Sequence, residues 1–473
     1  MMSFRSLRPA FATALLCAAT GCSLVPAYQR PAVHIPAEFK EAPAGWHAVA
    51  PADGQPRGEW WRAFNDPLLD GLEADATAHN QTVAAAVAAY DGERALLRES
   101  RANLWPDISA SVGVSRSGGS GNAGTTTSAG KRANASISAA WTPDLFGGLR
   151  AAVAQNNASM LASRASLGNA LLTIHAQLAS DYLQLRGTDA QLMAYQRTIT
   201  GYQRTLTITR NRYKVGVAAH MDVLQAETTL RNAQSQVTDM QRQRATLEHA
   251  IAVLSGRAPA DLTLVAQQWN NRVPAVPSAL PSDLLQRRPD VAAAERSVMA
   301  ANAAIGVQRA ALFPSLSVSA SSGRSGQVLG DLASGGSALW SLGLTGAMTL
   351  LDWGARSARV DQARASYEQG AANYRQTVLS ALQQTEDALV DLRSYADEAD
   401  NLKASSQAAD KVEQMTLNQY LAGTADYTAV VTAQNTALAA RRSAIAAVVQ
   451  QQQAAVALTQ AIGGGWDDSV PTR

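Results

Sequence analysis

The chain has 473 residues, of which 16% are charged and 47% hydrophobic, so it is too apolar for a disordered polyampholyte. With 40 basic against 38 acidic residues and no basic block, it is not a nucleic-acid binder by charge. No stretch of about 18 apolar residues marks a polytopic helical membrane protein, and two Cys exclude a disulfide scaffold. An Ala- and Gln-rich helical protein with some β segments remains.

The chain begins with a secretory signal. Arg5 and Arg8 precede a short apolar stretch, which ends in Ala19-Thr20-Gly21-Cys22. Small residues before a cysteine resemble the bacterial lipobox, in which cleavage before the cysteine is followed by its acylation. We therefore expect a lipoprotein signal peptide over 1–21 and lipidation of Cys22. The alternative is an ordinary signal peptide with a chance cysteine.

Four segments alternate apolar with small polar residues at a period of two, which predicts β-strands. In the first of them, Ile108, Val112 and Val114 alternate with Ser109 and Ser111. Strands of about ten residues with this pattern fit a lipid-facing and a lumen-facing side. The predicted strands are about 105–116, 134–143, 313–322 and 338–351, with exposed Gly/Ser-rich loops over Ser117–Lys131 and Gly323–Ser337.

Very long Pro-free helices follow each pair of strands, over about 149–213 and 355–420. At about 1.5 Å per residue, each spans roughly 100 Å, so such helices must pack side by side along their length. A tip turn follows each one, over 213–222 and 420–428, and then a further helix, over about 222–256 and 428–462. A filamentous coiled coil is the alternative, and the interleaved strands argue against it.

Landmarks of the first half recur in the second. Tyr213 and Tyr420 lie 207 residues apart (420 − 213), and so do Gly216 and Gly423 (423 − 216). The chain is therefore two copies of one unit. The expected organisation is a signal peptide 1–21, an N-terminal anchor and equatorial segment 22–65, repeat 1 over 66–272, a linker 273–288, repeat 2 over 289–465 and a tail 466–473. Each repeat opens with one helix before its strands.

Four membrane strands cannot close a barrel by themselves, and a bilayer does not tolerate an open sheet edge. Closure therefore needs several chains with at least eight strands in total. Three chains would give twelve strands, a number that leaves room for a pore.

Several motifs carry a family resemblance. They are the stretch from Cys22 to Pro31, Trp60–Leu69, Arg287–Val291 with its continuation to Leu316, and the two Tyr-x-x-Gly turns. In this order and with the duplication, the chain resembles the TolC-like outer membrane factors. Within them it resembles the lipoprotein branch, often called the NodT family.

The resemblance implies an α+β membrane protein, a homotrimer with a 12-stranded transmembrane β-barrel continued by a long periplasmic α-helical barrel. It implies the exit duct of a tripartite efflux pump, with a periplasmic adaptor and an inner membrane pump of the RND type as partners. The sequence shows no catalytic constellation, so we expect no enzyme, no cofactor and no bound nucleic acid. Alternatives are a duct for type I protein secretion and a structural outer membrane lipoprotein without a pore.

The resemblance also places the periplasmic gate at the tip turns, with their Gly216 and Gly423. Counting from Tyr213, the first-repeat acid of the family falls on Asp222, whose three copies would form an anionic ring. Counting from Tyr420, positions where related ducts often carry Asp and Arg fall on Thr432 and Asn435. We therefore expect a resting gate held by Tyr420, Asp222 and packing. The alternative role for Asp222 is helix N-capping.

Overall fold

The computed structural model describes residues 24–42, 58–117, 130–275, 288–334 and 337–464. The predicted signal peptide, Cys22, nearly all of the 273–288 linker and the tail lie outside these described residues. The chain folds into two compact units. Unit 1 takes residues from 1–32, 89–164 and 293–375, and unit 2 takes residues from 33–88, 165–292 and 376–473.

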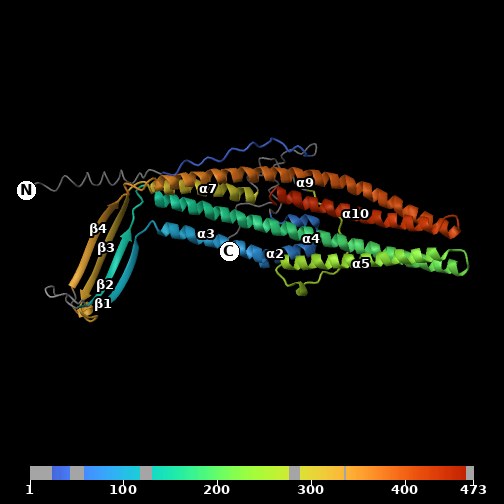
Figure 1. Ribbon diagram of the computed structural model, residues 1–473, viewed down its shortest axis with the longest axis horizontal. Coiled ribbons are helices and arrows are strands. Elements are labelled where there is room, and N and C mark those ends of the chain that lie inside the picture. The colour runs from blue at the N-terminus through green and yellow to red at the C-terminus, as the bar shows by residue number, and fades with distance from the viewer. Residues whose placement is uncertain (1–23, 43–57, 118–129, 276–287, 335–336, 465–473) are drawn as a thin grey trace, which may run out of the picture. The chain divides into compact units, whose positions relative to one another are not determined.

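Unit 1 contains one antiparallel sheet in the order β1-β2-β3-β4 (Figure 1). Its strands are β1 (Asp107–Ser117), β2 (Gly130–Trp141), β3 (Ser315–Gly326) and β4 (Ser337–Ala347). The four predicted strands are therefore present. The predicted irregular loop over Gly323–Ser337 is wrong in part, because β3 runs on to Gly326 and a short helix α8 (Asp331–Ser334) follows. Gly323 lets β3 stay in the sheet there, since a Cβ would lie 2.5 Å from the carbonyl oxygen of Ala135.

The strand register puts most apolar residues of the four strands on one face, whereas Leu339 of β4 pairs with Gly323 on the other. Ala110 pairs with Ile137, Ile137 with Ser322, and Ser322 with Trp340. The most exposed large apolar side chains of the sheet lie on this face, which we call the apolar face: Ile108, Val112, Val114, Ile137, Trp340, Leu342 and Leu344. The opposite face carries small polar residues, with Ser–Ser hydroxyl contacts of 2.9 Å between neighbouring strands.

Helices α3 (Gln81–Ala102) and α7 (Pro289–Ala310) contribute to unit 1 with the first parts of the long helices. The single helix expected at the start of repeat 1 is wrong, because α2 (Pro67–His79) ends before α3 begins. Asn80 separates them. Its Oδ1 accepts the backbone N–H groups of Thr82 and Val83, at 2.8 and 3.1 Å, and its Nδ2 donates to the Leu254 carbonyl. A side chain that caps the next helix competes with continuation of the previous one.

Four long helices dominate the chain: α4 (Gly148–Lys214), α5 (His220–Leu254), α9 (Ala355–Ala422) and α10 (Tyr427–Ala461). Helix α4 has 67 residues and α9 has 68, so each is about 100 Å long. Within the described part of the chain, no helix is both long and apolar enough to cross a membrane. In unit 2, Gly187 of α4 lets α10 approach closely, because a Cβ there would lie 2.3 Å from the Val449 side chain.

A large hydrophobic core of unit 2 joins α4, α5 and α10 to the N-terminal elements. The short 3-10 helix η1 (Trp60–Phe64) buries Trp61 and Phe64 in it, and α2 adds Leu69. This gives the Trp60–Leu69 motif a packing role. Asp66 completes the motif, because its carboxylate caps α2 through Leu68 N–H.

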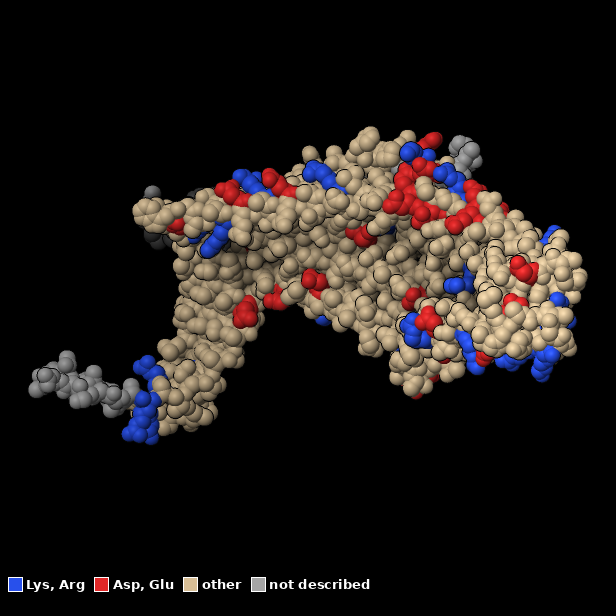
Figure 2. All heavy atoms as spheres, turned by 45° about the vertical axis from the view of Figure 1, so that its right-hand side comes forward, with Lys and Arg blue, Asp and Glu red and all other residues tan. Residues whose placement is uncertain are grey.

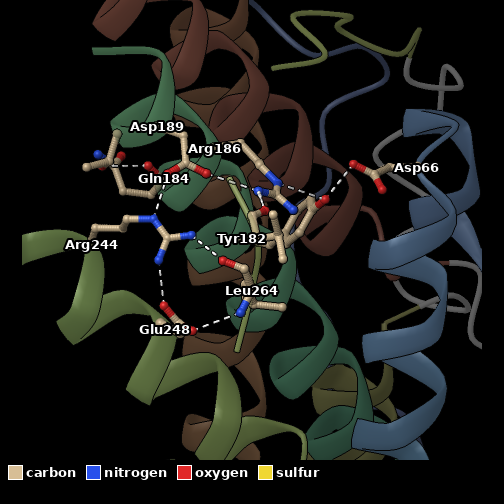
Figure 3. A network of polar contacts seen from close by, with 10 residues as sticks. Asp66, Tyr182, Gln184, Arg186, Asp189, Arg244, Glu248 and Leu264 are labelled. Carbon is tan, nitrogen blue, oxygen red and sulfur yellow. Dashed lines mark hydrogen bonds and ion pairs between the residues drawn. The ribbon is translucent and has the colours of Figure 1, made fainter. Parts of the chain in front are cut away.

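A buried polar network holds the same region together (Figure 3). The Tyr182 hydroxyl donates to Asp66 at 2.6 Å and accepts from Arg186, whose guanidinium pairs with Asp189 at 3.0 Å. Asp189 also accepts from Arg244 at 2.6 Å. Helices α2, α4 and α5 are thus linked through charges that stay buried because they are paired.

The Arg-Pro-Asp motif has a comparable role in unit 2. Arg288 forms a two-pronged pair with Asp290 at 3.0 and 2.6 Å and donates to Gln384 and to the Ala461 carbonyl. It therefore fastens the start of α7 to α9 and to the end of α10. The Trp60–Leu69 and Arg-Pro-Asp motifs therefore both have a structural role, because they connect helices to one another.

Candidate functional site at the helix tips

The tip of each helical hairpin is a turn made by glycine. Gly216 and Gly423 have φ of 76° and 79°, which favours glycine. Val217 N–H donates to the Arg212 carbonyl, five residues back, and Gly216 N–H to the Tyr213 carbonyl. The same two bonds recur at Gly423 and Thr424. Both long helices thus end in a Schellman motif, which explains why Gly216 and Gly423 stand at these positions.

The two tips of unit 2 share one hydrophobic core. It combines residues of all four helices: Tyr202, Leu206, Val223, Ala226, Leu230, Ala233, Tyr420, Tyr427, Val430 and Val431. The Tyr420 and Tyr427 rings meet edge to face at 5.6 Å. Burial raises the pKa of both Tyr427 and Tyr202, the latter to about 12, so these rings stay neutral.

Arg212 joins the first tip to the second. Its Nη1 donates to the Tyr420 carbonyl at 2.9 Å, and its guanidinium lies over the Tyr420 ring, 4.7 Å from the centroid. The cation therefore caps the carboxyl end of α9, where free carbonyls and the helix dipole favour positive charge. The equivalent residue of repeat 2 is Gln419 (419 − 212 = 207), which has no guanidinium. The first tip therefore donates a cation to the second tip, and the second tip has no equivalent cation at this position to donate to the first.

Asp222 lies in the first turn of α5, partly exposed, and its carboxylate accepts the Ala219 N–H at 3.2 Å. In the second tip the acidic residue, Asp426, is the N-cap of α10. Asp426 is exposed and accepts the Ala429 N–H at 2.8 Å. At an offset of 207 residues, Asp426 corresponds to Ala219 and Ala429 corresponds to Asp222, so the alanine and the aspartate are interchanged between the repeats. Each tip therefore carries one carboxylate at the start of its second helix.

The other predicted gate residues do not gather around Asp222. Tyr213 is exposed and its ring meets that of His220 at 5.1 Å. Thr432 and Asn435 are exposed on α10, where the Thr432 hydroxyl donates to the Thr428 carbonyl of its own helix. Of the predicted set, only Tyr420 lies in the tip core.

A cluster of ion pairs around Arg441 connects three of the helices near the tip core. Arg441 of α10 pairs with Asp410 and Glu413 of α9, at 2.7 and 2.5 Å, and donates to Thr198 of α4. A groove of about 530 Å³ runs between α9 and α10 and is lined by Asp426 and Thr432 among small residues. In the described residues, no three His, Cys, Asp or Glu side chains form a candidate metal site.

Sequence reasoning missed Arg212, Tyr427 and Asp426. Arg212 directly precedes Tyr213 in the tip motif, and a charged residue at this position could have been recognised as a candidate for a contact at the tip. Asp426 was detectable from the 207-residue offset, as the counterpart of Ala219. The contact of Arg212 with Tyr420 spans 208 residues and leaves no local pattern.

The fold and the paired tips define a class of proteins in which strands of membrane length continue into helical hairpins. The family model "Outer membrane efflux protein" matches this chain twice, over residues 72–257 and 280–464. The chain belongs to this family, and the two matches correspond to its two repeats.

Related proteins cover almost the whole chain. The probable efflux pump outer membrane protein TtgC of Pseudomonas putida is 30% identical over 94% of this chain and 93% of that protein. The pyoverdine export outer membrane protein OpmQ of Pseudomonas aeruginosa is 28% identical over 90% of this chain and 91% of that protein. The outer-membrane channel OprN superposes with a TM-score of 0.83 at 28% identity, covering 94% of this chain and 100% of that one. The open state of the Neisseria gonorrhoeae MtrE outer membrane channel superposes with a TM-score of 0.81 at 26% identity, covering 94% of this chain and 98% of that one.

Proposed function

We propose that this protein is the outer membrane exit duct of a tripartite efflux pump. Three copies would each give four strands to a twelve-stranded barrel, and their long helices would form the periplasmic duct. A periplasmic adaptor and an inner membrane pump of the RND type would complete the assembly and supply the energy. The relatives are efflux pump outer membrane proteins, which favours export of small molecules over protein secretion.

One observation carries this proposal, the sheet of unit 1. Its strands have 11 or 12 residues, the length of a tilted transmembrane strand, and the large exposed side chains along the middle of its apolar face are apolar. Its edges, β1 and β4, have no partner strand among the described residues. Because an unpaired edge in lipid leaves backbone groups unsatisfied, further copies are needed to close the sheet.

Aromatic residues support membrane insertion. Trp105, Trp141 and Trp353 lie where the strands meet the helices, and Trp353 is 90% exposed. Trp340 lies near the other end of β4 and is 80% exposed. Outer membrane barrels carry aromatic girdles at both interfaces of their apolar band.

The gate would lie at the tips. Three copies of Asp222 around the axis of a narrow lumen would form an anionic ring that attracts cations. Arg212 and Tyr420 would hold the two hairpins of each copy together. The outer membrane anchor would be acylated Cys22, since several buried acyl chains bind a bilayer far more firmly than one.

A deletion strain tests the function directly. Removing the gene should raise the cellular accumulation of at least one compound from a panel of dyes, solvents and antibiotics, and a plasmid copy should restore export. A Cys22→Ser copy should reach the membrane in lower amount. Unchanged accumulation of every compound, together with normal secretion of proteins by the deletion strain, would contradict the export function.

A further inference from the structure

The apolar face of the sheet ends in basic residues on the side away from the helices. In β1 the alternation of Ile108, Val112 and Val114 continues to Arg116, which lies on the same face. Lys131 of β2 is the direct cross-strand partner of Arg116. Arg324 of β3 also belongs to this face, two residues beyond Ser322. Figure 2 shows Lys and Arg side chains gathered at this end of the sheet.

These charges are not neutralised within the described part of the chain. Arg116 and Lys131 are exposed and form no ion pair with described residues. The Arg324 guanidinium donates to the Leu332 carbonyl of α8, while the carboxylate of Asp331 accepts the backbone N–H groups of Gln327 and Val328. Like charges directly opposite each other destabilise a strand pair, so Arg116 and Lys131 gain from an anion placed between them.

The spacing places these residues at a membrane surface. From Asp107 to Arg116, the charged residues near the two ends of β1, the strand rises about 30 Å at roughly 3.3 Å per residue. At a tilt of about 40° this is roughly 23 Å along the membrane normal, close to the apolar band of about 25 Å of an outer membrane barrel. The band itself is apolar on this face, with Val112, Ile137 and Leu342 exposed. Arg116 and Lys131 therefore stand at headgroup level, beyond the band.

We propose that Arg116, Lys131 and Arg324 bind the phosphate groups of a phosphorylated glycolipid in the outer leaflet. The proposal rests on the outer membrane duct function, which puts this end of the sheet outside. The planar guanidinium matches the oxygens of a phosphate, and the ammonium of Lys131 adds a compact charge. Each copy would contribute one such cluster, so a trimer would bind three lipids on its outer rim.

The matched control is Arg132, the neighbour of Lys131. It pairs with Ser115 and so lies on the opposite, small polar face, where it cannot reach lipid. Arg116→Gln/Lys131→Gln and Arg132→Gln all remove charge from the same end of the sheet. Arg116→Lys keeps the charge and replaces only the guanidinium, so it stays informative if the double variant folds poorly.

The experiment measures binding of fluorescent bis-phosphorylated lipid A to the full-length protein in detergent, with the dephosphorylated lipid as comparison. The double variant should bind roughly tenfold or more weakly. Arg132→Gln should bind as the wild type does, and Arg116→Lys should retain most binding. Excess inorganic phosphate should compete poorly, which distinguishes a lipid site from a free-phosphate site.

Equal loss in Arg132→Gln, or equal binding of the dephosphorylated lipid, would overturn the lipid site. The mass and conductance of the same samples separate this outcome from failure of the duct function. A conducting trimer that binds lipid A without regard to Arg116 and Lys131 refutes the inference alone. A protein that neither assembles nor conducts refutes the proposed function.

Discussion

Arg212 connects the two tips, because its guanidinium contacts both the Tyr420 ring and the end of α9. Arg212→Gln keeps a long polar side chain, as found at Gln419 in the other repeat, but removes the charge. We expect a larger resting conductance, since a lost charge-assisted hydrogen bond weakens the tie by about 1.5–3 kcal/mol. Arg210→Gln is the control, as the ion pair of Arg210 with Glu227 is exposed and is the only one that Arg210 forms with described residues. An equal rise in both variants would remove Arg212 from the gate.

Asp222 has two roles that substitutions can separate. Asp222→Asn loses the charge but keeps an oxygen able to accept the Ala219 N–H, whereas Asp222→Ala loses both. If the carboxylate forms an anionic ring, trivalent cations should block the wild-type channel and should block both variants much less. Should Asp222→Asn be blocked like the wild type, Asp222 would be a helix cap and nothing more.

The buried pair of Glu73 and His175 makes stability depend on pH. Their side chains are 2.6 Å apart, and burial raises the pKa of Glu73 from 4.5 to about 9 and lowers that of His175 from 6.5 to about 4. Both groups are therefore neutral at pH 7 when folded. Between about pH 6.5 and 9 the folded chain keeps a proton on Glu73 that the unfolded chain has lost. Stability should therefore fall as pH rises, by about 1.4 kcal/mol per unit at most.

Thermal unfolding in detergent at a series of pH values checks this. The midpoint of the wild type should drop between pH 7 and 9, and Glu73→Gln should show a flatter curve because it has no proton to lose there. At lower pH the two groups oppose each other, since protonation of unfolded His175 reduces stability as pH falls below 6.5. Parallel curves for wild type and Glu73→Gln over pH 7–9 would contradict the neutral pair.

At the scale of elements, the two faces of β1 can be tested at adjacent positions. Val112 lies on the apolar face in the middle of the strand, and Ser111 lies on the small polar face. Val112→Lys should destabilise the inserted protein by about 2–4 kcal/mol, the effect of a cation facing lipid near the bilayer midplane. Ser111→Lys should insert normally. Heat-resistant oligomer in outer membrane fractions measures both, and equal loss would contradict the assignment of faces.

The elements that sequence could predict are those with a local signal. The period-two alternation identified all four strands, and the Pro-free Ala-rich stretches identified the long helices. The break between α2 and α3 was missed because the Asn80 side chain donates to Leu254, 174 residues away. The Arg212 contact was missed for the same reason, and α8 was missed because four residues carry no periodic pattern.

At the scale of the whole molecule, the duplication explains why two hairpins can close on each other at the tips. Each repeat contributes two strands, a helix of about 100 Å and a Schellman turn. Two departures from symmetry lie at the tips: Arg212 corresponds to Gln419, and Asp222 corresponds to Ala429, with the acid of the second tip at Asp426 instead. The copies therefore differ where we place the gate, as they also do elsewhere, for example at Tyr182 and Leu389.

Single-channel recording of the purified full-length protein in planar bilayers, with its mass in detergent, tests the duct most directly. The account predicts a mass of three chains, small cation-selective steps that trivalent cations block, and larger steps for Arg212→Gln. A single chain that gives no conductance, in the wild type and in Arg212→Gln alike, would contradict the duct and favour a structural lipoprotein without a pore.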